Sequence, residues 1–125
     1  MGLDQYAYKV KRVRRLTDFE YPKNALVDKD FDYWRKFYGL QNWMENLYRE
    51  KGGNKCIFNC VPLRLTEQDL DRLERDSKED VFYSERYCET LVKEKEYEGE
   101  HLKAFIQNAK QALFEGYAVY YNSWW

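Results

Sequence analysis

Thiols, an imidazole and carboxylates are the side chains of this sequence that could do chemistry. Cys56, Cys60 and Cys88 with His101 could supply four ligands, but Cys-x3-Cys followed by two isolated ligands matches no known zinc spacing. We therefore expect no metal site. An odd number of cysteines without a secretion signal is typical of reduced thiols, so we expect these to be small, buried hydrophobic side chains.

Other routes to catalysis lack their usual groups. A nucleophile needs a base beside it, and His101, the one histidine, lies far from Cys60 along the chain. Carboxylates are abundant from Glu67 to Glu100, but no spacing pairs two of them in an apolar cleft, as acid–base catalysis would require. Walker, GxGxxG, HExxH and GxSxG motifs do not occur. We expect neither enzymatic activity nor a cofactor.

Charge is distributed unevenly along the chain. Residues 1–65 carry 13 basic and 8 acidic side chains, a net charge of +5, whereas residues 66–100 carry 6 and 13, a net charge of −7. The sharpest basic cluster consists of Lys9, Lys11, Arg12, Arg14 and Arg15. Such a cluster could bind the phosphates of a nucleic acid. Against that interpretation, the acidic segment would repel nucleic acid, and edge strands often carry Lys and Arg to prevent pairing with other chains.

Length and composition indicate an ordinary globular chain. With 125 residues, 44% of them hydrophobic and 18% aromatic, we expect one domain over 1–125 with a real core. No apolar run is long enough to span a bilayer, and the basic start lacks the apolar centre of a signal peptide. The sequence therefore predicts a soluble, cytoplasmic protein without a membrane anchor.

The spacing of apolar residues predicts the elements of the first half. Residues 5–13 alternate as in a strand, and the stretch from Thr17 to Asp30 is typical of a loop. A helix is expected from Phe31 to about Glu50, with its inward stripe formed by Tyr33, Phe37, Leu40, Met44 and Leu47. The glycines of KGGN, residues 51–54, should end that helix.

The second half starts with an extended segment, residues 56–65, in which Pro62 indicates an edge, a bulge or a strand end. Thr66 should cap a helix whose inward side carries Leu70, Leu73 and Val81. Residues 82–100, with apolar positions at Tyr87, Leu91 and Val92, fit either a charged helix or a long excursion. A last helix is expected from about Glu98 to Gly116, with its apolar stripe formed by Leu102, Phe105, Ile106, Ala109, Ala112 and Leu113.

The aromatic tail after Gly116 alternates as a strand does, with Tyr117, Val119 and Tyr121 on one side. We expect it to pair with the N-terminal strand or with residues 57–65. The fold class that follows is α+β, with three or four helices packed on a small, mainly antiparallel sheet of N-terminal, middle and C-terminal strands. Trp124 and Trp125 lie beyond the clear alternation, so they either cap the core or remain as anchors for a partner.

Four stretches of the sequence resemble a widespread family of small phage and prophage proteins. These are the opening MGLDQY, the tract YWRKFYGLQNWM at 33–44, the pair Asn59 and Cys60 before LRLTEQDLDRL, and the closing YAVYYNSWW. The family begins MGLDMYL, carries YWRKxNxIHxWF, has a CG or NC region before a capped helix, and ends in an aromatic-serine-tryptophan tail. The resemblance covers most of the chain and implies a phage setting rather than a function. The family's histidine falls at Gln41 and its asparagine at Tyr38, so an activity that relied on that histidine is not expected.

The phage setting and the absence of catalytic motifs favour binding without catalysis. We expect an accessory protein that inhibits a bacterial host protein, for instance a defence factor such as a CRISPR effector, by occluding its surface. The partner-binding residues expected from the tract, the acidic helix and the tail are Trp34, Arg35, Lys36, Tyr38, Trp43, Asp69, Asp71, Glu74, Asp76, Trp124 and Trp125. A plainer interpretation is that Trp34 and Trp43 cover the sheet while Arg35 and Lys36 are solvated.

Two other functions remain open from the sequence. A nucleotide-sequestering pocket would use Trp34, Arg35, Tyr38 and Trp43. A nucleic-acid-binding protein would use the basic residues between 9 and 15. A second copy of the chain is a further partner that the sequence allows.

Overall fold

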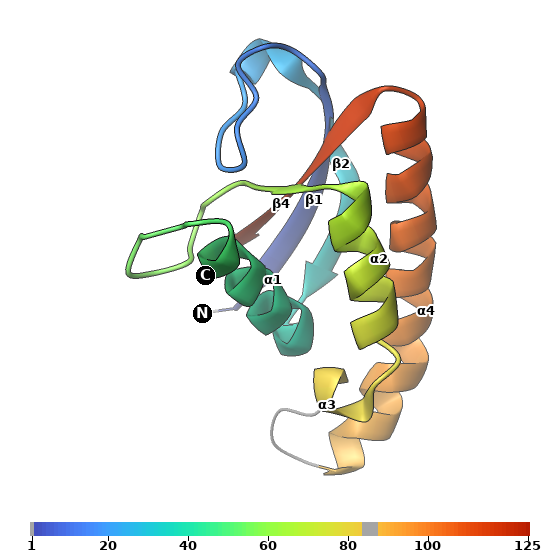
Figure 1. The fold of residues 1–125 in the computed structure, drawn as a ribbon. Coiled ribbons are helices and arrows are strands. Elements are labelled where there is room, and N and C mark those ends of the chain that lie inside the picture. Colours follow the sequence, from blue (N-terminus) through green and yellow to red (C-terminus); the bar gives the residue numbers. More distant parts are fainter. Residues whose placement is uncertain (1, 84–87) are drawn as a thin grey trace.

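One antiparallel sheet and the helices on one of its faces make up the computed structural model of the chain (Figure 1). The structure describes residues 2–83 and 88–125, with side chains for all of these except 80, 81 and 88–97. The elements in chain order are β1 (Asp4–Lys11), the short 3-10 helix η1 (Lys23–Ala25), β2 (Leu26–Arg35), α1 (Tyr38–Glu50), β3 (Leu63–Leu65), α2 (Glu67–Asp76), α3 (Asp80–Tyr83), α4 (Cys88–Phe114) and β4 (Tyr117–Trp124).

The sheet has the strand order β2-β1-β4-β3, so the two strands nearest the chain ends lie at its centre. β1 and β4 pair along their whole length, from Asp4 opposite Trp124 to Lys11 opposite Tyr117. The expected α+β class and the expected terminal strand are therefore confirmed, and β4 pairs with both of the candidate partners. Residues 118–121 of β4 are all buried, because both faces of the sheet are covered along that part of the strand.

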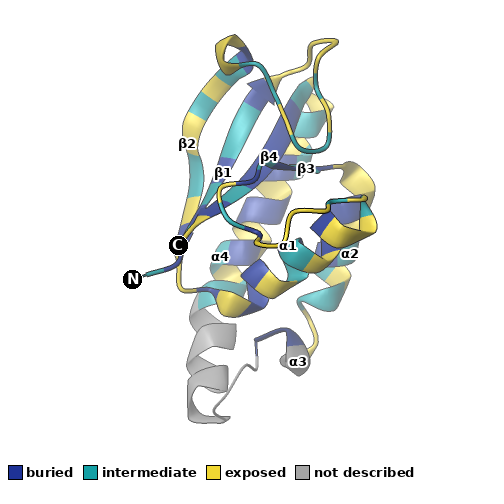
Figure 2. Cartoon of the chain, turned by 90° about the vertical axis from the view of Figure 1, so that its left-hand side faces the viewer, coloured by how far each residue is buried: buried dark blue, intermediate teal, exposed yellow. Residues whose placement is uncertain are grey.

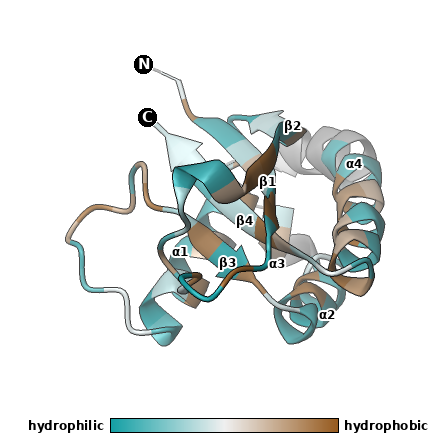
Figure 3. Ribbon diagram, turned by 90° about the horizontal axis from the view of Figure 1, so that it is seen from above, coloured by the Kyte–Doolittle hydropathy of each residue, from teal (hydrophilic) through white to brown (hydrophobic). Residues whose placement is uncertain are grey.

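Helices cover one face of the sheet, which we call the inner face. Side chains of α1, α2 and α4 form a single apolar cluster with Ala7, Val119 and Tyr121 from the strands. Viewed from above, α2 and α4 lie next to each other on this side (Figure 3). The opposite, outer face is covered at one end only, where residues 12–25 pack over Val10 and Tyr120. The edge strand β2 remains largely exposed or half-buried (Figure 2).

The expected helix from Phe31 was wrong over its first seven residues. Residues up to Arg35 belong to β2, because Tyr33 pairs with Tyr6 and Arg35 with Asp4 of β1. Alternation places Trp34 on the inner face, where a strand buries an aromatic side chain well. The predicted loop from Thr17 to Asp30 is correspondingly shorter, since β2 begins at Leu26. The helix itself begins at Tyr38, and its expected end at KGGN is confirmed by Gly52, whose φ is +98°.

Thr66 caps α2 as predicted, in a full capping box. The Asp69 backbone N–H donates to Thr66 Oγ1, and the Asp69 carboxylate accepts from the Thr66 N–H at 2.9 Å. The predicted extended segment 56–65 forms a strand only over Leu63–Leu65, directly after Pro62, which has no N–H to donate. Its earlier part still touches the sheet, because the Cys60 N–H donates to the Ser123 carbonyl at 2.8 Å.

The last helix was predicted too short. α4 begins at Cys88, ten residues before the expected start at Glu98. Of the two alternatives for residues 82–100, the charged helix is therefore confirmed for residues 88–100. The expected apolar stripe of α4 faces the core, and Gly116, with φ of +95°, ends the helix region. The helix that Thr66 caps was predicted to reach Val81, which was wrong, because α2 ends at Asp76 and Val81 belongs to α3. The side chains of Val81, Tyr87, Leu91 and Val92 lie outside the described residues. Within the described residues, no helix is both apolar and long enough to cross a membrane.

Candidate functional site

The two chain ends lie close together at one end of the sheet (Figures 1 and 2). Exposed aromatic side chains gather there. On the outer face, Asp4 of β1 lies between Trp124 of β4 and Arg35 of β2. Tyr33 lies on the same face of β2, two residues before Arg35. On the inner side, Tyr38 and Trp125 line a pocket of about 330 Å³. We call the set Tyr33, Arg35, Tyr38, Trp124 and Trp125 the aromatic patch.

Hydrogen bonds hold two rings of the aromatic patch in place. The Trp125 N–H donates to Asn59 Oδ1 at 3.0 Å, and the Asn59 amide donates back to the Trp125 carbonyl at 3.0 Å. The indole Nε1 of Trp125 donates to the Phe58 carbonyl, also at 3.0 Å. Trp125 nevertheless remains 48% exposed. It is thus tied to Phe58 and Asn59 while part of it stays at the surface.

Tyr33 is fixed in a similar way on the outer face. Its hydroxyl donates to Asp4 Oδ1 at 2.6 Å, and this hydrogen bond to the carboxylate raises the pKa of Tyr33. The ring of Tyr6 lies 5.3 Å from that of Tyr33, and the ring of Tyr8 stacks on Tyr6 at 6.3 Å. A row of tyrosines, in which Tyr6 and Tyr8 are half-buried, therefore extends from the aromatic patch along the outer face.

Two tryptophans expected to bind a partner do not belong to the aromatic patch. Trp34 is only 2% exposed and packs in the core, where it stacks on His101 at 5.2 Å. Trp43 is half-buried, and its indole Nε1 donates to Asp76 at 2.9 Å. The proposed nucleotide pocket of Trp34, Arg35, Tyr38 and Trp43 was therefore wrong, because a strand and a helix direct these side chains to different places. Lys36 is exposed beside the aromatic patch, with φ of +58°.

The acidic residues of α2 are already engaged within the molecule. Asp69 is buried in the capping box and forms an ion pair with Lys51 at 2.6 Å. Lys110 of α4 contacts Asp71 at 2.7 Å and Glu74 at 3.5 Å, and the hydrogen bond that Lys110 donates to Asp71 raises the pKa of Lys110. The fourth residue, Asp76, accepts from Trp43. Asp69 is therefore buried away from a binding partner, whereas Asp71, Glu74 and Asp76 stay partly exposed although each has a contact within the molecule.

The basic residues between 9 and 15 are at the other end of the sheet. Lys9 is half-buried with its Nζ 4.6 Å from the centre of the Tyr117 ring. Lys11, Arg12, Arg14 and Arg15 are exposed, and in the described part of the chain none of them makes an ion pair or a hydrogen bond through its side chain. Their charges are therefore uncompensated by near neighbours.

A buried polar network occupies the inner face and was not predicted. The Gln5 amide group donates to the Phe37 carbonyl and the Tyr121 hydroxyl, both at 2.9 Å, and accepts from the Phe37 N–H at 2.8 Å. The Tyr121 hydroxyl in turn donates to Gln41 at 2.6 Å. Burial raises the pKa of Tyr121, so this hydroxyl stays protonated and structural.

The groups considered for chemistry are separate in space or already bound. The imidazole of His101 is hydrogen-bonded to Asp32 at 2.6 Å and lies against Trp34. Cys56 and Cys60 are exposed, which corrects the prediction of buried thiols, and Cys88 lies outside the described side chains. Among the residues that the structure describes, no three His, Cys, Asp or Glu side chains come together to bind a metal ion.

Comparison with known proteins yields no relative for this arrangement. The chain matches no protein-family model, no curated protein and no solved structure.

Proposed function

We propose that this chain is a small binding protein without catalytic activity, which docks on a bacterial host protein through the aromatic patch and inhibits it. The observation that carries the proposal is the exposure of large aromatic rings from separate segments beside Arg35. Trp124 is 64% exposed and Tyr33 is 45% exposed. Tryptophan, tyrosine and arginine are the residues that most often dominate the energy of protein interfaces.

The order of the aromatic patch also favours binding. Trp125 is held through three hydrogen bonds and Tyr33 through one, so these rings have little freedom to lose on association. Ordering flexible side chains at an interface costs about 0.5–1.5 kcal/mol for each, and a pre-ordered ring avoids most of that cost. The terminal pocket of about 330 Å³ between Tyr38 and Trp125 could receive one side chain of a partner.

The partner class follows from the phage setting that the resemblance implies. A small phage protein that binds a host factor without chemistry would act by occluding that factor's working surface, in the cytoplasm of the host cell. A bacterial defence factor such as a CRISPR effector is the first class to test. Since the α2 carboxylates are paired with Lys51, Lys110 and Trp43, imitation of nucleic acid by that helix is not part of the proposal.

The test is capture of the partner from bacterial lysate and measurement of its affinity after purification. We expect a stoichiometric protein that stays bound after nuclease treatment. Trp124→Ala and Tyr38→Ala should each weaken the purified complex about 30-fold, the effect of losing a hot-spot residue. Ile57→Ala is the matched control, because Ile57 is 60% exposed but lies outside the aromatic patch.

Three outcomes would count against the proposal. One is retention of nothing, or of material that nuclease removes. Another is a partner whose affinity falls equally in Ile57→Ala. The last is capture only of a second copy of this chain, which would make the aromatic patch a dimer interface.

A further inference from the structure

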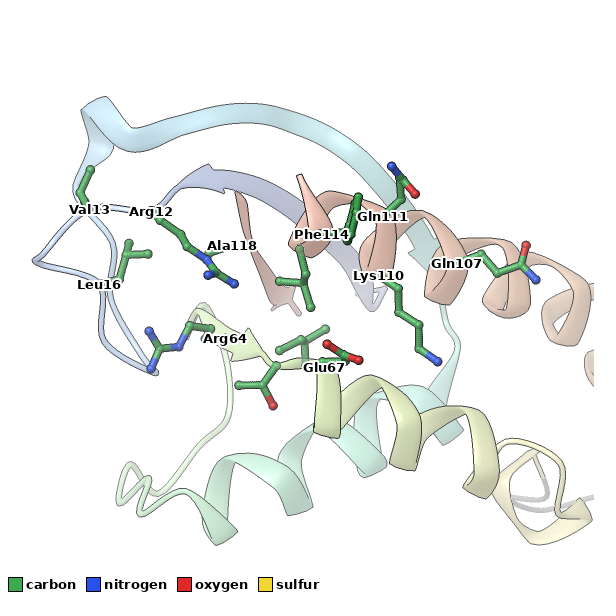
Figure 4. A pocket seen from close by; sticks show the side chains of 13 residues that line it. Arg12, Val13, Leu16, Arg64, Glu67, Gln107, Lys110, Gln111, Phe114 and Ala118 are labelled. Atoms are coloured by element: carbon green, nitrogen blue, oxygen red, sulfur yellow. The ribbon is translucent and has the colours of Figure 1, made fainter. Parts of the chain in front are cut away.

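A second candidate site lies at the opposite end of the sheet from the aromatic patch. It is a pocket of about 790 Å³ between the loop that follows β1, the strand β3, the start of α2 and the last turns of α4 (Figure 4). Pockets of about 300–1,000 Å³ are the usual size for bound ligands. We call it the Arg12 pocket.

Three cations line the Arg12 pocket, and one of them has no acidic partner among the described residues. Arg12, Arg64 and Lys110 line the pocket together with one carboxylate, that of Glu67. Arg64 is held by Asp18 at 2.9 Å, and Lys110 is held by Asp71 and Glu74 of α2. Arg12 has no such partner in the described part of the chain, so its charge is free to meet an anion.

An exposed ring stands at the same pocket. Phe114, in the last turn of α4, is 87% exposed, and Val13 across the pocket is 41% exposed. Burying a phenylalanine is normally favourable, so a ring left in water at the rim of the pocket that holds the unpaired Arg12 is suited to stacking against a planar group. Planar and anionic chemistry together describe a nucleotide unit.

The positive surface continues beyond the Arg12 pocket. Arg14 is exposed at the turn of the loop, and Arg15 lines a second pocket of about 670 Å³ on the loop's other side. That second pocket also contains Lys23, Lys55 and the carboxylate of Glu20, with the rings of Phe19, Tyr21 and Tyr48. The loop therefore carries the exposed side chains of Arg14 and Arg15 between the Arg12 pocket and this second pocket, both of which contain aromatic rings.

We propose that the loop after β1 and the Arg12 pocket bind single-stranded nucleic acid. One base stacks on Phe114 inside the Arg12 pocket, and successive phosphates pass Arg12, Arg14 and Arg15. A single nucleotide would use only the first of these cations, so a polymer fits the charges better. A base inside a duplex is not available to Phe114, so an unpaired strand fits the ring better.

The test is the affinity of the purified protein for a fluorescent oligothymidylate of about 12 nucleotides, measured by anisotropy at several salt concentrations. If Arg12, Arg14 and Arg15 each meet one phosphate, affinity should fall about 18-fold between about 50 mM and about 200 mM salt. With Arg14→Ala and Arg15→Ala together, the fall should shrink to about threefold.

A second set of variants separates stacking from charge. Phe114→Ala should weaken binding about tenfold while leaving the salt dependence unchanged, because stacking releases no counterions. Lys29→Ala with Lys103→Ala is the matched control, since both lysines are exposed elsewhere and the change in net charge is the same. This control should bind as the unaltered chain does.

The proposal is overturned by any of four results. These are no binding at about 50 mM salt, an equal loss of affinity in the control, binding of duplex as tightly as single strand, and binding of a mononucleotide as tightly as the oligomer. An equal affinity for thymidine monophosphate would assign the pocket to free nucleotides instead.

Discussion

Replacement of Gln5 by leucine tests whether the buried polar network holds the junction between β2 and α1. Gln5 is fully buried and bonds both the N–H and the carbonyl of Phe37, the residue directly before α1. Leucine has a similar volume, so a cavity contributes little. The variant instead leaves the buried N–H of Phe37 without a partner. The Phe37 carbonyl loses the bond from Gln5 but still accepts from the Gln41 N–H at 3.1 Å.

The expected loss of stability follows mainly from that N–H. An unsatisfied buried group costs about 1–3 kcal/mol, so we expect Gln5→Leu to lower the free energy of unfolding by about 2 kcal/mol. Gln68→Leu is the matched control, because Gln68 is exposed on α2, and its effect should stay within about 0.5 kcal/mol. Urea unfolding followed by tryptophan fluorescence measures both values.

A double-mutant cycle with Tyr121→Phe sharpens the result. Gln5 and Tyr121 are joined by a hydrogen bond of 2.9 Å, so their effects should not add, and a coupling of about 1 kcal/mol is expected. If Gln5→Leu costs less than about 1 kcal/mol, or if the cycle is additive, the network does not stabilise this junction and the reasoning is refuted.

Three further predictions concern close packing, burial and ionisation. Gly39→Ala should lower the free energy of unfolding by more than about 2 kcal/mol, because a Cβ there would lie 1.9 Å from the Phe82 carbonyl oxygen. Gly99→Ala in α4 should be neutral or stabilising in the same urea assay, because its Cβ would meet only the Tyr83 side chain, at 3.3 Å from the hydroxyl oxygen. Trp34→Ala should cost about 3–5 kcal/mol, whereas Trp124→Ala should change stability by no more than about 0.5 kcal/mol; similar losses in the two variants would contradict the burial that separates them. Burial raises the pKa of Tyr120 to about 12 and also raises that of Tyr121, so the folded state holds protons that the unfolded chain releases above about pH 10. The free energy of unfolding should therefore be fully retained at about pH 9 and fall towards pH 12, and a flat profile between about pH 9 and pH 11 would disagree with this.

Features that depend on a few neighbouring residues could be predicted from the sequence. The alternation of β4, the Thr66 cap of α2, and the glycines that end α1 and α4 are such features. Each rests on a local rule: side-chain period, a hydroxyl that accepts a nearby N–H, or a left-handed φ that favours glycine. The α+β class followed because these local elements were mostly of the right type.

Features that depend on partners far away along the chain were misjudged. The spacing of Tyr33, Phe37 and Leu40 is helical, yet pairing with β1, about 30 residues earlier, makes a strand of the stretch up to Arg35. The acidic residues of α2 look free in the sequence, because Lys110, which binds Asp71 and Glu74, comes from the end of another helix.

The candidate sites show the same division between sequence and tertiary structure. The sequence by itself determined the supply of aromatic and basic side chains, the lack of catalytic motifs and the strand that carries the tail. Only the tertiary structure decided that Trp34 lies inside and Trp124 outside, and that Arg12, Arg64 and Lys110 share one pocket. The physical reason is that exposure and charge pairing depend on which distant segments pack together, whereas period, caps and turns are set within a few residues.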